Sequence, residues 1–159
     1  LMVVAKSDES LQSLARQFKL REVVKRYSAL VKGHMNLSEG IINAPLGRNP
    51  RHRKKMSVVE GGRGAITSYR VERSFSECTL LEVTPTTGRT HQIRVHMASI
   101  GHPIVGDSVY GSQCRELGRH FLHASYLQFH LPESGQVVEV KSQLPIELQL
   151  TLDSLADNG

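Results

Sequence analysis

The distribution of strand-like segments most constrains the fold of this chain. Residues 23–33, 65–75, 78–84, 120–130 and 136–142 are predicted strands, and the first, VVKRYSALVKG, is rich in β-branched residues and ends at a glycine. The short link Ser76-Glu77 predicts a hairpin between 65–75 and 78–84. Many strands with few helices predict an α+β domain built on a mainly antiparallel or mixed sheet, flanked by a few helices.

Two segments have helical character. Ser7 is a predicted N-cap with Asp8 and Glu9 in the first turn, followed by an apolar stripe expected to be buried, namely Leu11, Leu14, Ala15 and Phe18. Thr90 is a predicted cap for a second helix, which has Ile93, Met97 and Ile100 on one face and stops at Gly101. Residues 40–62 are expected to be irregular, 102–118 to form a structured loop, and 144–155 to form a short strand or helix.

Length and charge narrow the class of protein. The 159 residues suit a single domain over residues 1–159, and 39% hydrophobic residues are enough for a packed core. The net charge of +5 favours a polyanionic partner, nucleic acid first, although a solvated basic surface explains the charge as well. Cys78 and Cys114 lie in no metal or redox spacing and are expected to be reduced thiols of a cytoplasmic protein. No apolar run is long enough to span a membrane, so no membrane partner is expected.

A dense basic run lies in the middle of the chain. Five cations fall between positions 48 and 55, namely Arg48, Arg51, Arg53, Lys54 and Lys55. Like charges at this density repel one another unless water or phosphates neutralise them. The run predicts contact with RNA, and the alternative is a solvated surface loop.

Residues 88–96, GRTHQIRVH, place several potential cations where a loop leads into a helix, which is a natural anion site. A partly buried Arg94 needs a carboxylate partner from elsewhere in the fold. His91 and His96 are poorly spaced for one metal ion, and His120 and His123 fall on a predicted strand that separates them. No metal site is therefore expected.

Several ordered motifs resemble the RluA-like family of ribosomal large-subunit RNA pseudouridine synthases. Residues 25–33 are similar to its K-x-Y-x-A-x-V-x-G strand, and residues 88–111, GRTHQIRVHMASIGHPIVGDSVYG, are similar to its longest signature. Residues 45–48, 55–56, 67–69, 122–124 and 144–145 match further motifs in the family's order. The resemblance covers essentially the whole chain.

The catalytic H-R-L-D motif of the family does not occur in this sequence. The opening residues, Leu-Met-Val-Val-Ala-Lys, resemble the stretch that follows that motif, and the unbroken apolar run at 1–5 looks like a buried strand entered from upstream. The resemblance thus implies that the nucleophilic aspartate lies upstream of Leu1. None of the later aspartates is expected to replace it, and Asp107 is expected to belong to a structural loop.

The resemblance implies the conversion of uridine to pseudouridine in structured RNA, most typically 23S-type large-subunit rRNA and in some relatives tRNA, without cofactor or metal. The target base would flip out of its stack. The implied catalytic-site residues are Tyr27, which contacts the base, Arg94, which pairs with the nucleophilic aspartate, and Leu144, which packs against the tyrosine. Arg89 and His91 would shape the loop or contact the RNA. As printed, the chain is expected to be inactive, with Arg94 lacking its acid.

Two other functions remain open at this stage. An RNA-binding module without catalysis explains the charge and the basic run, but not the match of Tyr27, Arg94 and Leu144 to one active site. A metal-dependent hydrolase would use some of the eight histidines.

Overall fold

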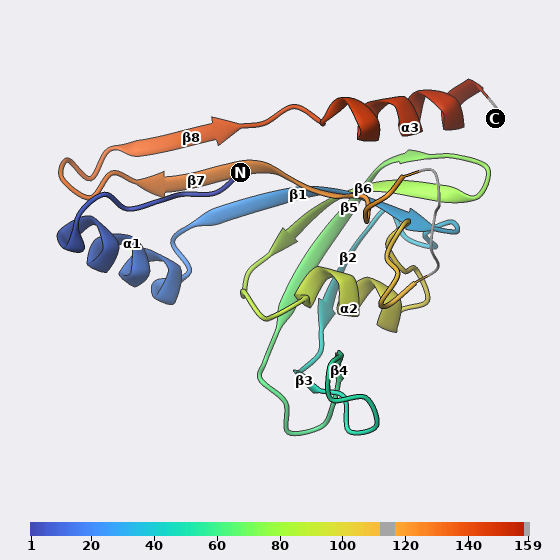
Figure 1. Cartoon of the computed structure of the whole chain (residues 1–159), viewed down its shortest axis with the longest axis horizontal. Coiled ribbons are helices and arrows are strands. Elements are labelled where there is room, and N and C mark those ends of the chain that lie inside the picture. Colours follow the sequence, from blue (N-terminus) through green and yellow to red (C-terminus); the bar gives the residue numbers. More distant parts are fainter. Residues whose placement is uncertain (112–116, 158–159) are drawn as a thin grey trace.

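The computed structural model describes residues 1–111 and 117–157, and the predicted thiol of Cys114 lies outside them. Within this described part the elements are, in chain order, α1 (Asp8–Leu20), β1 (Val24–Lys32), β2 (Glu39–Asn43), β3 (Leu46–Arg48), β4 (Met56–Val58), β5 (Ile66–Ser74), β6 (Cys78–Pro85), α2 (Gln92–Ser99), β7 (Leu122–His130), β8 (Val137–Lys141) and α3 (Ile146–Asp157) (Figure 1). The predicted α+β class is confirmed.

The main sheet has the strand order β2-β5-β6-β1-β7-β8, and neighbouring strands pair antiparallel. β1 lies near the middle, so Tyr27 faces Val83 of β6 on one side and Ala124 of β7 on the other. The predicted hairpin of β5 and β6 is confirmed by their antiparallel pairing. The centre of the sheet therefore brings together segments that lie far apart in the sequence.

The expectation that residues 40–62 are irregular is wrong. They contain most of β2 and a separate two-stranded sheet, the β3–β4 hairpin, in which Leu46 pairs with Val58 and Arg48 with Met56. Each of its strands has only three residues, too few to show an alternating pattern against the intervening charges. In Figure 1 this hairpin lies beyond α2, away from the main sheet.

The core forms where helices cover the central strands. Ala29, Leu30 and Val31 of β1 are consecutive and fully buried, which requires cover on both faces of the sheet. Met97 of α2 and Leu148 of α3 belong to the same core cluster. Burial of these aliphatic side chains fixes α2, and with it Arg94, relative to β1.

The first helix begins as predicted but buries a different face. Ser7 caps α1, and its hydroxyl accepts the Ser10 N–H at 3.2 Å. Leu14 and Gln17 are buried, whereas Leu11 and Phe18 are exposed, so the predicted apolar stripe is only partly correct.

Gln17 is buried because its amide bonds to the backbone of His130 at the end of β7. Its Nε2 donates to the His130 carbonyl, and its Oε1 accepts the His130 N–H, both at 2.8 Å. A polar residue on the buried face of α1 thus continues the hydrogen bonding of the sheet.

The start of the second helix also departs from expectation. The N-cap of α2 is His91, in the left-handed region at φ 56°, and not Thr90. Ile93 and Met97 are buried as predicted, but Ile100 is exposed. The tail forms a helix, α3, so the open choice between strand and helix is resolved.

Candidate functional site

A cavity of about 390 Å³ opens between β1, the start of α2 and the turn before α2, which comprises residues 86–91. We call it the Tyr27–Arg94 pocket, after two of the residues that line it. Four predicted site residues come together here, namely Tyr27, Arg89, His91 and Arg94. Its size falls within the range of pockets that hold a small organic group such as a nucleoside.

Tyr27 enters this pocket from the middle of β1. The pairing of β1 with β7 shifts register between Arg26 and Tyr27, and such irregularities re-aim side chains near functional sites. Burial raises the pKa of the Tyr27 hydroxyl above its ordinary value, so the phenol keeps its proton at neutral pH. Tyr27 therefore offers an aromatic face and a hydrogen-bond donor.

Arg94 does have an acidic partner within the chain. Its Nε donates to Oδ2 of Asp107 and its Nη2 to Oδ1, each at 2.7 Å, in a bidentate pair. The Arg94 side chain is 13% exposed and that of Asp107 is 0% exposed. The expectation that a partly buried Arg94 takes a carboxylate partner from elsewhere in the fold is confirmed, since Asp107 comes from the loop after α2.

Asp107 is held as an anion by the groups around it. Its Oδ1 also accepts the N–H groups of Val109 at 2.9 Å and Tyr110 at 3.1 Å. Burial opposes ionisation, but the bonds from Arg94 and these N–H groups, together with the charge of Arg94, hold the pKa of Asp107 below its ordinary value. The fully buried carboxylate has the structural role expected for its loop.

The bonds to Asp107 leave part of the Arg94 guanidinium available. A guanidinium carries five N–H donors, and Asp107 engages Nε and Nη2, so the N–H groups of Nη1 remain. Among the described residues no second carboxylate forms an ion pair with Arg94. The arginine that lines the pocket is thus oriented by one acid and able to bind another.

Two further residues line the Tyr27–Arg94 pocket, Gln92 and Lys25, and neither was predicted as a site residue. Buried Gln92 holds the turn before α2: its Oε1 accepts the Thr87 hydroxyl at 2.7 Å and the Arg89 N–H at 3.0 Å. Lys25 lines the pocket two residues before Tyr27, and burial lowers the pKa of its ammonium group. For Lys25, the only indication in the sequence of a place in the site is its position in the K-x-Y motif of residues 25–33.

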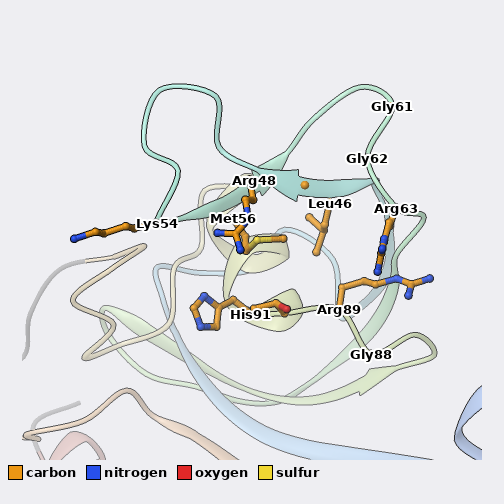
Figure 2. A pocket seen from close by; sticks show the side chains of 12 residues that line it. Leu46, Arg48, Lys54, Met56, Gly61, Gly62, Arg63, Gly88, Arg89 and His91 are labelled. Atoms are coloured by element: carbon orange, nitrogen blue, oxygen red, sulfur yellow. The ribbon is translucent and has the colours of Figure 1, made fainter.

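A second cavity, of about 620 Å³, lies between the β3–β4 hairpin and the same turn (Figure 2). Arg48 and Lys54 line it from the hairpin side, and Arg89 and His91 from the turn. Arg63, which the sequence analysis did not select, lines it as well. We call this cavity the basic pocket.

The cations of the basic pocket are not paired with any carboxylate that the structure describes. In the described part of the chain, the ion pairs involve none of its arginines or lysines. Arg48 donates instead to the Arg53 carbonyl at 3.0 Å, and Arg89 to the Gly64 carbonyl at 3.2 Å. Uncompensated cations around one cavity favour a polyanionic ligand.

The other predicted RNA-contacting residues lie outside this cavity. Arg51 and Arg53 are exposed in the loop between β3 and β4. The ammonium group of Lys55 donates to the Val109 carbonyl at 2.8 Å, so Lys55 holds the hairpin against the loop that contains Asp107.

The turn before α2 forms a wall of both cavities, since Gly88, Arg89 and His91 line each of them. His91 Nδ1 lies 2.9 Å from the hydroxyl of Tyr110. Burial, with the nearby charge of Arg94, lowers the pKa of His91, so its ring is neutral at pH 7.

Leu144 is not among the residues that line either cavity. It packs against the main core cluster, as Tyr27 does. The described residues contain no cluster of three or more His, Cys, Asp or Glu side chains suited to a metal ion, and thus give no support to a metal-dependent hydrolase.

Comparison with known proteins identifies the class. The family model described as RNA pseudouridylate synthase matches residues 1–99, and the chain belongs to this family. Relatives named ribosomal large subunit pseudouridine synthase D occur among the similar sequences, as the RluA-like motifs predicted.

Individual relatives are similar to this chain over nearly its whole length. An uncharacterized RNA pseudouridine synthase of Chloroflexus aurantiacus is 47% identical over 161 residues, which cover 100% of this chain and 51% of that protein. The ribosomal large subunit pseudouridine synthase D of Nitrosomonas europaea is 44% identical, covering 98% of this chain and 47% of its own length. The chain thus spans about half the length of these curated relatives.

Solved structures support the same fold. Human RNA Pseudouridylate Synthase Domain Containing 1 superimposes with a TM-score of 0.79 and 31% identity, covering 96% of this chain and 74% of that one. Among the described residues, no helix is long and apolar enough to cross a bilayer.

Proposed function

We propose that this chain is most of the catalytic domain of an RNA pseudouridine synthase that acts in the cytoplasm on large-subunit rRNA. The observation that carries the proposal is the convergence of Tyr27 and Arg94 on one pocket, beside a basic pocket that shares its wall. The relative in Nitrosomonas europaea, named for the ribosomal large subunit, supports rRNA as the substrate.

In the proposed reaction the target uridine flips into the Tyr27–Arg94 pocket. The N1–C1′ bond breaks, the base turns, and a C5–C1′ bond forms. C5 loses its proton and N1 takes one up, so the reaction is an isomerisation that needs no cofactor or redox partner. Tyr27 stacks on the base, and its hydroxyl assists the transfer of the C5 proton.

The nucleophile in this proposal is an aspartate upstream of Leu1. The free N–H groups of Arg94 would pair with it and keep it ionised, while Asp107 holds the other edge of the guanidinium. The backbone nitrogen of Leu1 lies 3.3 Å from the carbonyl oxygen of Ala124, and Ala124 is the β7 neighbour of Tyr27. A segment that preceded Leu1 would therefore start beside this site.

The basic pocket would bind the RNA backbone next to the flipped uridine. Arg48, Lys54, Arg63 and Arg89 form no ion pair with any carboxylate that the structure describes and would neutralise phosphates, while His91 lies on the shared wall. The exposed Arg51 and Arg53 would extend this contact beyond the cavity, and Lys55 would add charge from the hairpin. The same groups would accept a tRNA substrate, since phosphate contacts carry no sequence information.

A second candidate function is an RNA-binding module without catalysis. The observation that favours it is that the described residues lining the Tyr27–Arg94 pocket include no Asp or Glu, while the one described acid that pairs with Arg94 is fully buried. In this case the 159 residues bind RNA through the basic pocket and perform no chemistry.

Tritium release from rRNA carrying 5-tritiated uridine separates the two functions. We expect release from a version with the native upstream residues restored, its loss in Tyr27→Phe and Arg94→Lys of that version, and none from the 159 residues alone. Release from the 159 residues would refute the upstream nucleophile. RNA binding without release from any version would favour the binding module.

A further inference from the structure

Residues 107–110 form a turn that is hydrogen-bonded to a residue of each cavity, Arg94 of the Tyr27–Arg94 pocket and Met56 of the basic pocket. At one end, the carboxylate of Asp107 holds Arg94 of the Tyr27–Arg94 pocket. At the other, the Val109 carbonyl accepts the ammonium group of Lys55, and the Tyr110 hydroxyl accepts the N–H of Met56 at 2.9 Å. The β3–β4 hairpin is thus bonded twice to the turn that fixes Arg94.

Tyr110 contacts both Arg94 and His91 through its ring. The guanidinium carbon of Arg94 lies 5.0 Å from its ring centroid, in cation–π geometry. Its ring also meets that of His91 edge-on, at 5.7 Å between centroids. It packs beside the cluster of Leu46, Ala65 and Val95, between the hairpin and α2.

The hydroxyl of Tyr110 links the two walls of the basic pocket. It accepts from Met56 on the hairpin, and it lies 2.9 Å from His91 Nδ1 on the opposite wall. A phenol has one proton, so with its oxygen accepting from Met56 it donates that proton to a neutral His91 ring. The lowered pKa of His91 supports this arrangement.

We propose that Tyr110 is a positioning residue that couples RNA on the β3–β4 hairpin to the orientation of Arg94. A phosphodiester in the basic pocket attracts cations on both walls, Arg48 and Lys54 on one side and Arg89 on the other. Movement of the hairpin shifts Met56, and the Tyr110 ring transmits this shift to the guanidinium that lies over it. The coupling rests on the proposed function, in that it requires RNA to bind at the hairpin.

NMR tests the coupling without any need for catalysis. The 159-residue chain, labelled with ¹⁵N, would be titrated with a short single-stranded oligouridylate. The Nε–H signal of Arg94, assigned by its absence in Arg94→Lys, and the amide signal of Met56 would be followed. We expect both signals to shift and to saturate at the same RNA concentration.

In Tyr110→Phe we expect the RNA-induced shift of Met56 to remain and that of Arg94 to disappear. The RNA affinity should stay within about twofold of the parent, because every cation is retained. Tyr126→Phe is the matched control, since Tyr126 also has an arginine over its ring, Arg26 at 4.6 Å, and a hydroxyl that donates to Gln128 at 2.9 Å, whereas the ring and hydroxyl of Tyr110 contact Arg94 and Met56. An Arg94 shift that persists in Tyr110→Phe overturns the coupling. So does the absence of RNA-induced shifts at Met56 or Arg94 in the parent.

Kinetics provide a second readout in the version with upstream residues restored. Tyr110→Phe should lower kcat about tenfold and leave KM nearly unchanged, because the misplaced group acts in the transition state. Arg48→Ala should instead raise KM. A purely structural role for Tyr110 would lower kcat only in proportion to the folded fraction. If no version releases tritium while the Arg94 shift depends on Tyr110, the proposed function fails and the coupling stands.

Discussion

At the residue scale, the partner of Arg94 shows what a sequence can and cannot predict. Partial burial on α2 indicated that Arg94 needs a carboxylate, and the structure supplies one. The identity of that acid depends on the loop after α2, where Gly106 adopts φ 77° against the Arg119 carbonyl and turns Asp107 inward. A loop path of this kind leaves no periodic signal.

The Asp107–Arg94 pair leads to a stability prediction. Asp107→Asn leaves a largely buried guanidinium without its counter-charge, so we expect the free energy of unfolding to fall by about 3 kcal/mol. Urea unfolding followed by circular dichroism measures the change. Glu147→Gln breaks the exposed Arg119–Glu147 pair and should cost less than about 1 kcal/mol. Equal losses in the two variants would contradict a special role for the buried pair.

His96 leads to a pH prediction. It is fully buried, the Thr67 hydroxyl lies 2.8 Å from its Nδ1 and the Ala44 carbonyl 3.0 Å from its Nε2, and burial lowers its pKa. The folded state therefore binds fewer protons than the unfolded chain below the ordinary histidine value of about 6.5, and stability should fall as the pH drops from there. The lowered pKa of Asp107 affects the pH dependence of stability only near and below about pH 4, where aspartates ordinarily titrate.

Urea unfolding at pH 7 and pH 5 measures this loss. His96→Gln should be less stable than the parent at pH 7 but should lose less stability on acidification. An unchanged pH dependence in His96→Gln would assign the effect to other groups.

At the element scale, the sequence predicted long elements and missed short ones. The hairpin of β5 and β6 has nine- and eight-residue strands with visible β patterns, and it was predicted correctly. The three-residue strands β3 and β4 were missed, because their pairing depends on Leu46 docking beside α2. The buried face of α1 was misjudged because Gln17 is buried by hydrogen bonds and not by apolar character.

Gln17 also leads to a test. Gln17→Leu keeps the size of the side chain but leaves the backbone N–H and C=O of His130 without these partners, so we expect a loss of about 2 kcal/mol. Thermal unfolding gives the stability, and hydrogen exchange at the His130 amide should accelerate. Gln12→Leu, on the exposed side of the same helix, is the control and should change neither quantity appreciably.

At the scale of the whole molecule, the site is assembled from distant segments. Tyr27 on β1 and Arg94 on α2 meet because β1 and α2 share the core. The family motifs predicted both as site residues, but their spacing along the chain gave no distance between them. Only some of the cations that line the basic pocket belong to the basic run in the sequence. Arg48 and Lys54 lie in that run, whereas Arg63 lies outside it and reaches the pocket only through the fold.

RNA affinity should depend on salt through the cations of the basic pocket. Arg63→Gln and Arg89→Gln should each flatten the slope of log K against log salt by about 0.7, if each neutralises one phosphate of a single strand. Arg16→Gln, on exposed α1, removes the same charge elsewhere and should leave the slope nearly unchanged. Fluorescence anisotropy over a salt series measures the slopes. Equal effects of all three would point to net charge and not to the pocket.

The shared wall of Gly88, Arg89 and His91 has a consequence for protein engineering. Under the proposed function, a substitution there would alter RNA docking and the reaction pocket together, so variants selected for a new RNA target would be expected to lose turnover at the same time. The hairpin side of the basic pocket, with Arg48 and Lys54, lines only one cavity. Libraries that aim to retarget the protein should therefore be built on the hairpin and should leave the wall intact.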